Sequence, residues 1–450
     1  MRRIALAHAV SVWEVAVQVE ERSVISAPRR PFGLAAAIAG FLGSDIPIGI
    51  DCYDGSRLGP SDSAARIVVH SPKALRYVLT GPGEIGFARA YVAGELEVEG
   101  DIFEALALRD NLPDVKVTPR EWLLLARAAG VEGLKPLPPP PEEVRVRGRR
   151  HTKERDAAVI AHHYDVSNDF YRMILGPSMT YSCAVFAEPD TTLEAAQSAK
   201  YELVSRKLGL KPGMRLLDVG CGWGGMVLHA AQEHGVRAVG VTLSNRQADW
   251  ARESVRAAGL EDQVEIRVQD YRDVIDGPFD AISSIGMFEH VGAAKLDEYF
   301  TRLYTLLRPG GRLLNHGIAK RPSPRAAFSH RGFIDRYVFP DGELHEVGSV
   351  VTRVQRAGFE VRNVEGLREH YAQTLRHWVA NLEENWDEAV HLVGPGRARV
   401  WRLYMAASAI NFDAERNHIH QVLAVRNQPD GTSDMPRRPN WEPPSQLAAP

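Results

Sequence analysis

A glycine-rich turn between an apolar run and a helical segment is the feature that most restricts how this chain can fold. Residues 214–219 form the apolar run, residues 220–225 read Gly-Cys-Gly-Trp-Gly-Gly, and residues 226–233 have helical character. A strand, a glycine turn and a helix in this order are typical of nucleotide-binding α/β sheets. Glycines there let the backbone approach a ligand beside a helix N-terminus. A tight strand–helix turn without a ligand is the competing interpretation.

Further strands after this turn predict the fold class. We expect them over residues 238–243, 264–268, 279–285 and 311–314, with helices between them, which is typical of a parallel sheet flanked by helices. Polar residues follow these strands, at the edge where α/β sheets bind ligands. The turn is Gly-x-Gly-x-Gly and resembles that of class I S-adenosylmethionine-dependent methyltransferases. The resemblance implies an α/β, Rossmann-like domain with a mostly parallel seven-stranded sheet, to which the sequence adds a small N-terminal α+β domain.

Composition limits the classes of protein that fit. The chain has 450 residues, a formal net charge of −3 and 44% apolar residues, values typical of a soluble globular protein with two or three domains. Its near-neutral charge gives no long-range attraction to nucleic acid. The three cysteines do not suit a disulfide scaffold, and no apolar stretch reaches the ~18 residues of a membrane span. The expected localisation is cytoplasmic.

Proline, charge and composition predict five segments along the chain. Residues 1–30 are expected to be a disordered leader, because polar residues interrupt its weak likeness to a signal peptide. Residues 31–134 are the small α+β domain, and residues 135–155 are a linker, Pro-rich at first and then basic. Residues 156–426 are the methyltransferase-like domain. Residues 427–450 are predicted to be a disordered tail.

Several further motifs resemble one family of such methyltransferases. They are residues 163–171, residues 179–184 (Met-Thr-Tyr-Ser-Cys-Ala), residues 218–225, residues 286–292 (Gly-Met-Phe-Glu-His-Val-Gly), residues 333–342, and the pairs 370–371 and 374–375. Many class I enzymes end their second strand with an acidic residue, but residues 241–244 read Val-Thr-Leu-Ser, with Gln247 shortly after. In this order the motifs resemble the cyclopropane fatty-acid synthase and mycolic-acid cyclopropane synthase family.

The resemblance implies a cofactor site and a catalytic site. The residues that would bind S-adenosylmethionine are Tyr164, Tyr181, Ser182, Asp218, Gly220, Gly222, Thr242, Gln247, Asp270 and Tyr271. The residues that would hold a bicarbonate ion are Cys183, Glu289, His316 and Tyr371, with the backbone of Ile318 contributing. In the family's reaction, a cis alkene takes the methyl group, and bicarbonate then removes a proton from that group so that a cyclopropane ring closes.

The chemistry of these residue types suits the implied roles. His316 and the Tyr371 hydroxyl can donate hydrogen bonds to an anion, and Glu289 can accept one. Aromatic faces stabilise a sulfonium or a carbocation. Each residue also has a purely structural interpretation: Cys183 as a small core residue, His316 as a strand-end histidine, Glu289 as a helix cap and Tyr371 as a core aromatic.

The implied substrate is an unsaturated phospholipid acyl chain, which requires transient contact with a membrane surface. The basic run over residues 145–155 is the expected contact with the inner face of the membrane. No nucleic-acid partner is expected. No metal is expected either, since the adjacent His162 and His163 lack a Cys/His framework. Whether the chain forms a homodimer is left open.

Three alternatives stay open. The first keeps the same carbocation but ends in a methylene branch, which a separate partner reductase would convert to a methyl branch. The second is a non-catalytic lipid-binding protein, which the set of Cys183, Glu289, His316 and Tyr371 disfavours. The third is a methyltransferase acting on a small molecule or a nucleic acid, which the bulk charge disfavours.

Overall fold

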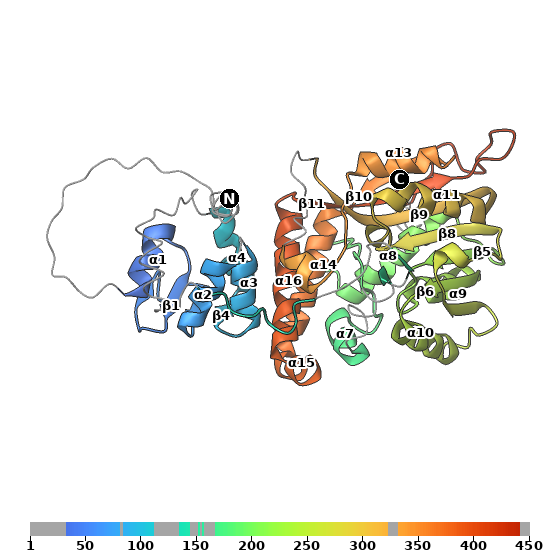
Figure 1. The fold of residues 1–450 in the computed structure, drawn as a ribbon. Coiled ribbons are helices and arrows are strands. Elements are labelled where there is room, and N and C mark those ends of the chain that lie inside the picture. Colours follow the sequence, from blue (N-terminus) through green and yellow to red (C-terminus); the bar gives the residue numbers. More distant parts are fainter. Residues whose placement is uncertain are drawn as a thin grey trace. The chain divides into compact units, whose positions relative to one another are not determined.

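The chain divides into two compact units in a computed structural model that describes residues 33–81, 84–111, 135–144, 152–153, 155–156, 167–322 and 332–441 (Figure 1). The first unit comprises Met1–Arg145, His330–Val338 and Gly394–Ile410, and the second comprises Val146–Ser329, Phe339–Val393 and Asn411–Pro450. Two segments from within the expected domain 156–426 therefore belong to the first unit. The predicted leader, Tyr164 and most of the basic run lie outside the described residues.

The first unit contains a four-stranded sheet with the order β2-β1-β3-β4. Its strands are β1 (Gly49–Cys52), β2 (Arg57–Leu58), β3 (Ala65–Val69) and β4 (Leu96–Gly100), and its helices include α1 (Leu34–Leu42), α2 (Pro72–Thr80), α3 (Glu84–Val92), α4 (Ile102–Asn111) and α12 (Phe333–Tyr337). β1 and β3 pair in parallel, whereas β2 and β4 join antiparallel. This mixture of elements is that of an α+β domain.

The proline-rich residues 135–144, expected to begin a linker, are hydrogen-bonded within the first unit. The Tyr77 hydroxyl donates to the Pro138 carbonyl over 2.9 Å, and Arg89 donates to Glu143 over 2.8 Å. Proline has no N–H to donate, but its carbonyl still accepts. The described part of the segment is therefore fixed by its carbonyls and by Glu143.

The second unit is built on a seven-stranded sheet with the order β10-β11-β9-β8-β5-β6-β7 (Figure 1). Its strands are β5 (Arg215–Val219), β6 (Arg237–Thr242), β7 (Val264–Val268), β8 (Phe279–Ile285), β9 (Leu307–Lys320), β10 (Glu360–Gly366) and β11 (Asn417–Val425). β5 to β9 pair in parallel, and β11 and β10 extend the sheet antiparallel. The prediction of a Rossmann-like, mostly parallel seven-stranded sheet is confirmed.

Helices of the second unit pack on this sheet and on one another, and two hydrophobic cores lie against the sheet. They are α7 (Asn168–Leu175), α8 (Leu193–Leu208), α9 (Gly225–His234), α10 (Asn245–Ala257), α11 (Leu296–Leu306), α13 (Val347–Arg356), α14 (Arg368–Glu384) and α15 (Trp386–Val393), with short 3₁₀ turns η1 (Tyr271–Asp273), η2 (Phe288–His290) and η3 (Ala293–Lys295). One core joins α8, α9 and α10 to the sheet, and the other joins α11 and α13 to it. The long helix α16 (Pro395–Asp413) is divided between the units, and its residues from Pro395 through Ile410 belong to the first unit. Central strands covered on both faces are mostly apolar.

Strand β9 is much longer than the sequence pattern predicts. A strand was expected over residues 311–314, with Asn315 and His316 following it, but β9 runs from Leu307 to Lys320. Each residue of β11 pairs with β9, from Asn417 opposite Lys320 to Val425 opposite Arg312. His316 is therefore an interior strand residue, because an antiparallel partner that is distant in sequence extends the strand past its apolar run.

The described part of the predicted disordered tail makes specific hydrogen bonds within the second unit. Arg312 donates to the Asp434 carbonyl over 3.1 Å, and Arg362 donates to the Ser433 hydroxyl over 2.8 Å. Residues 442–450 lie outside the described part of the chain. None of the helices that the structure describes is both long enough and apolar enough to cross a membrane.

We predict that Ile282→Ala, in the central strand β8, lowers the free energy of unfolding by about 2–5 kcal/mol, because it leaves a cavity in a fully buried position. The matched control is Ile275→Ala, because the Ile275 side chain is 87% exposed and its loss should change stability by less than ~0.5 kcal/mol. Urea titration of both variants measures the difference. Equal destabilisation by the two changes would contradict the observed burial.

Candidate active site

A cavity lies at the carboxyl ends of β5, β6, β7 and β8 in the second unit. The predicted cofactor residues that line it are Tyr181, Ser182, Asp218, Gly220, Gly222, Thr242, Gln247, Asp270 and Tyr271. Tyr164 is outside the described residues. The structure thus gathers all the described members of the predicted set at the sheet edge where α/β folds bind ligands.

The glycine turn forms one wall of the cavity, and its conformation explains its composition. Gly220 has a φ of +81°, and a Cβ there would lie only 2.9 Å from Cγ of Met287. Gly224 has a φ of +89° and immediately precedes α9. Left-handed backbone is accessible mainly to glycine. The turn therefore brings the backbone and the N-terminus of α9 to the cavity without filling it.

At the end of β6, two polar side chains stand where many related folds carry an acidic residue. The Thr242 hydroxyl donates to Oε1 of Gln247 over 2.9 Å, and the Ser244 hydroxyl caps α10 by accepting from the Gln247 backbone N–H over 3.2 Å. Because Oε1 is engaged in this way, the amide nitrogen of Gln247 faces the glycine turn, 3.9 Å from the position of a Cβ on Gly222. The edge thus offers an amide donor.

Two aspartates in the cavity have pKa values that are shifted in opposite directions. Burial raises the pKa of Asp218 to about 6, against a 2.6 Å hydrogen bond from the Ser283 hydroxyl. Burial acts in the same direction on Asp270, but hydrogen bonds from Arg272 outweigh it and lower the pKa of Asp270. Both carboxylate oxygens of Asp270 accept from the Arg272 guanidinium, at 2.8 and 2.6 Å. Asp270 therefore stays ionised within an ion pair.

Glu289 is buried beside β9, on the turn η2. Its Oε1 accepts from the backbone N–H of Ile318 over 2.7 Å, whereas its Oε2 is buried without a partner among the described residues. Burial raises the pKa of Glu289 to about 7, although the Ile318 hydrogen bond opposes this. The carboxylate is directed at a strand, so the helix-cap interpretation does not describe it.

His316 and Cys183 are also fully enclosed. Neither ring nitrogen of His316 has a partner among the described residues, and burial holds its pKa well below the ordinary value, so the ring is neutral. Burial raises the pKa of Cys183, which stays a thiol with Sγ 3.2 Å from the Ala184 carbonyl. Both groups are therefore buried in their uncharged forms, and the imidazole of His316 is also without a hydrogen-bond partner among the described residues.

Backbone pairing connects the segments that carry three of the predicted catalytic residues, Ile318, Tyr371 and Cys183. Ile318 pairs with Ile419 across β9 and β11, and the carbonyl of Ile419 accepts from the N–H of Leu367 over 3.0 Å. The Leu367 carbonyl accepts from the N–H of Tyr371 over 3.1 Å and lies 3.7 Å from Sγ of Cys183. The start of α14 therefore joins these residues, next to the cavity wall at Ser182 and Met287.

Lys200 is a site residue that the sequence analysis missed. Its side chain is fully buried, lines the cavity, lies 3.4 Å from the centre of the Tyr201 ring and donates to the Ser182 hydroxyl over 3.1 Å. Burial lowers the pKa of Lys200 to about 7, and the nearby Asp218 opposes this. The available signal was periodicity, because Lys200 falls on the buried stripe of α8 between Ala196 and Val204.

Aromatic side chains form a continuous group beside these residues. The Tyr181 ring lies 6.0 Å from that of Tyr171 and 5.3 Å from that of Trp378. The Tyr371 ring lies 6.0 Å from that of Trp378 and 4.9 Å from that of Phe412. Such rings exclude water and present negative faces that favour a cation.

A Rossmann-like sheet with a glycine turn at the cavity is typical of S-adenosylmethionine-dependent methyltransferases. Comparison with known proteins shows to which family of these methyltransferases the chain belongs. The family model described as mycolic acid cyclopropane synthetase matches residues 151–422. A probable fatty acid methyltransferase of Mycobacterium tuberculosis is 47% identical over 408 residues, which cover 88% of this chain and 95% of that protein. This chain belongs to the mycolic acid cyclopropane synthetase family of methyltransferases.

Two further proteins illustrate the similarity. The cyclopropane-fatty-acyl-phospholipid synthase of Escherichia coli is 34% identical over 368 residues, which cover 82% of this chain and 89% of that protein. Among solved structures, mycolic acid cyclopropane synthase CmaA1 complexed with SAH and CTAB has a TM-score of 0.56 and 34% identity, and the match covers 60% of this chain and 97% of that one. The family resemblance read from the sequence is thus confirmed.

We predict that Gly220→Ala weakens binding of S-adenosylmethionine at least tenfold, because the added Cβ meets Met287 and shifts the turn that walls the cavity. Gly213→Ala is the control, because Gly213 has a similar φ of +80° with no atom near its Cβ position. Isothermal titration calorimetry measures the affinity of both variants. An equal loss in the two variants would point to backbone strain alone.

We predict that Lys200→Met raises the melting temperature most at low pH. The folded-state pKa of about 7 lies below the ordinary 10.5, so between these values the unfolded chain binds more protons and the stability of the unchanged protein rises with pH. The methionine variant lacks this dependence on pH. Its melting temperature should therefore exceed that of the unchanged protein most below about pH 7, and the difference should decrease toward pH 10.5.

The matched control for this change is Lys211→Met, because Lys211 is exposed. Its melting temperature should stay close to that of the unchanged protein at every pH. Thermal melts of both variants at a near-neutral and an alkaline pH measure the difference. A gap for Lys200→Met that does not change with pH would contradict the buried-amine explanation.

Proposed function

We propose that this protein transfers a methyl group from S-adenosylmethionine to the cis double bond of an unsaturated phospholipid acyl chain and closes a cyclopropane ring. The observation that carries this proposal is that two buried side chains, Glu289 and His316, have polar atoms without a partner among the described residues, and that Met287 and His290, which flank Glu289, line the cofactor cavity. The fold, which is that of a methyltransferase family, supports the methyl transfer. The unsatisfied atoms of Glu289 and His316 support the later removal of a proton.

The proposed reaction has two steps, and together they place three demands on the residues. The alkene carbon bonds to the methyl carbon as the bond from methyl to sulfur breaks, and the neighbouring alkene carbon becomes positive. A proton then leaves the transferred methyl group, and the electron pair of that C–H bond closes the ring. The protein has to align the partners, exclude water and stabilise positive charge. The rings of Tyr181, Tyr371 and Trp378 suit the last two tasks.

The unsatisfied atoms fit a small anion that carries its own hydroxyl group. Neutral His316 has one N–H to donate, and Glu289 Oε2 can accept from the hydroxyl group. The backbone of Ile318 contributes by holding Glu289, since its N–H donates to Oε1. Bicarbonate, when bound, supplies the base for the methyl proton. Lys200 in its protonated form acts on both His316 and Cys183, and this charge favours an anion at this place.

The acyl chain reaches the site, in this proposal, by transient contact of the protein with the inner face of the membrane. Two cations of the basic run are already paired within the second unit: Lys153 with Asp273 at 2.7 Å and Arg155 with Asp341 at 2.9 Å. Contact with lipid then rests on the remaining cations of the run, which lie outside the described part of the chain.

The test uses purified protein, trideuteromethyl-labelled S-adenosylmethionine and vesicles of dioleoyl phospholipid, with and without bicarbonate. Fatty-acid methyl esters are then analysed by mass spectrometry after alkene derivatisation. A saturated product that gains one carbon, keeps two deuterons and depends on bicarbonate supports the proposal. A product that still reacts as an alkene identifies the methylene-forming alternative, for which a partner reductase would be needed. No gain of label overturns both.

We predict that Glu289→Gln lowers turnover at least 100-fold, because the amide NH₂ cannot replace the anionic acceptor. Affinity for S-adenosylhomocysteine should not change, since Glu289 lies outside the described lining of the cofactor cavity. The control is Glu298→Gln on α11, where the Glu298 side chain is 55% exposed. Initial rates and calorimetry on the two variants make the comparison, and full activity of Glu289→Gln would remove this residue from the mechanism.

A further inference from the structure

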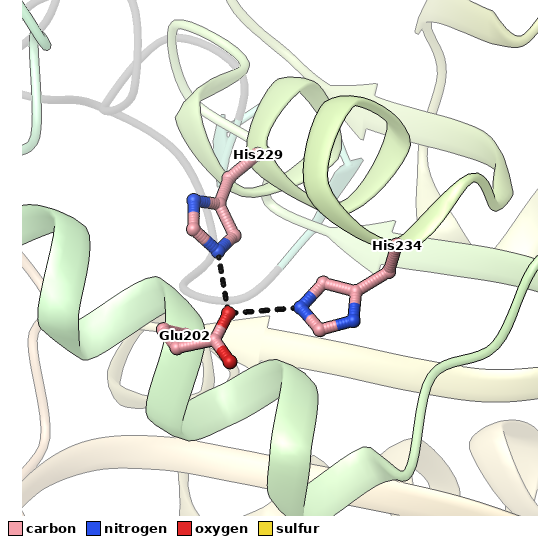
Figure 2. A group of neighbouring side chains, drawn as sticks. All are labelled: Glu202, His229 and His234. Atoms are coloured by element: carbon pink, nitrogen blue, oxygen red, sulfur yellow. Dashed lines mark hydrogen bonds and ion pairs between the residues drawn. The ribbon is translucent and has the colours of Figure 1, made fainter. Parts of the chain in front are cut away.

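Three partly buried side chains of the second unit meet at one carboxylate oxygen (Figure 2). Nε2 of His229 lies 3.3 Å and Nε2 of His234 lies 2.9 Å from Oε2 of Glu202. Glu202 belongs to α8, and both histidines belong to α9. The three atoms lie within 4.8 Å of one another, although Glu202 and the histidines are far apart in the sequence.

These donors form a chemically recognisable set. Two imidazole nitrogens with one carboxylate oxygen are ligands that Zn²⁺ takes in proteins, with a water at the fourth position. None of the three residues is among the described lining of the cofactor cavity, and the proposed reaction does not use them. Their convergence therefore calls for a role of its own.

The spacings of the two histidines from Glu202 are close to those of a tetrahedral site. Two ligands bonded to one Zn²⁺ at about 2.0–2.1 Å lie about 3.3 Å from each other. The 3.3 Å between His229 and Glu202 has this value, and the 2.9 Å between His234 and Glu202 has to open by a few tenths of an ångström.

The surroundings hold the carboxylate in place and leave an entry path. Arg206 donates to the other oxygen of Glu202, Oε1, over 2.6 Å, which leaves Oε2 for a monodentate bond. The exposed fractions of the side chains are 28% for Glu202, 13% for His229 and 18% for His234. An ion can therefore reach the cluster from solvent and lose most of its water there.

We propose that Glu202, His229 and His234 form a binding site for a divalent transition-metal ion of the Zn²⁺ type. The ion would join α8 to α9, two helices that also bound the cofactor cavity. Tyr201, next to Glu202, lines that cavity, and its ring lies 5.9 Å from the ring of His229. The bound ion thus acts as a clamp on one wall of the cavity and not as a reactant.

The experiment titrates Zn²⁺ alone into chelator-treated full-length protein, followed by calorimetry and by thermal melting. We expect one ion to bind with micromolar affinity or better. The ion should raise the melting temperature, because a ligand that binds the folded state and not the unfolded state stabilises the folded protein. Titration with Co²⁺ adds an absorption spectrum that reports the coordination geometry. No binding below about 100 μM Zn²⁺ overturns the proposal.

The variants are His229→Asn, His234→Asn and Glu202→Gln, each of which removes one ligand. We expect each to weaken Zn²⁺ binding at least tenfold and to abolish the rise in melting temperature. The control is His391→Asn, because His391 is exposed on α15, away from the cluster in the sequence, and should bind as the unchanged protein does. Circular dichroism before addition of metal verifies that each variant is folded. Equal binding by all variants places the ion elsewhere and overturns the proposal.

Discussion

The pairing of β9 with β11 is the interaction on which the candidate active site depends. It keeps β9 extended through Lys320, so that His316 and Ile318, two residues apart, place their side chains on one face of the strand. The Ile318 N–H can then donate to Glu289. The carbonyl of Ile419, which lies opposite Ile318 on β11, accepts from the N–H of Leu367. A strand that ended at residue 314 would leave these groups without a common frame.

Burial of ionisable groups gives this frame its chemistry. Lys200, Asp218, Glu289 and His316 all have pKa values moved toward the neutral form, and in each case burial is the largest cause. Such groups destabilise the fold unless a ligand or a partner satisfies them. The apolar cores on the sheet offset that cost. The site therefore contains several buried groups with shifted pKa values, and such groups are typical of active sites.

Much of the methyltransferase sheet could be predicted from the sequence, because apolar runs and glycine turns are local signals. β7 and β8 match the predicted ranges, and β5 and β6 differ from them only at their ends. Lys200 was missed because a lysine in a helix is ordinarily a surface residue, and only its place on the buried stripe of α8 marked it. The length of β9 was missed because the antiparallel β11 that extends it lies about 100 residues further on.

The sequence by itself determined the order along the chain of the parallel strands β5 to β9, the glycine turn and the family, since each of these is encoded in short contiguous stretches. Only the tertiary structure decided which side chains share an environment. It left buried polar atoms of Glu289 and of His316 unsatisfied, enclosed Lys200, and brought Glu202 to two histidines on another helix. The reason is physical: burial, pKa and ligand geometry depend on distances between residues that are remote in the chain, and packing alone sets those distances.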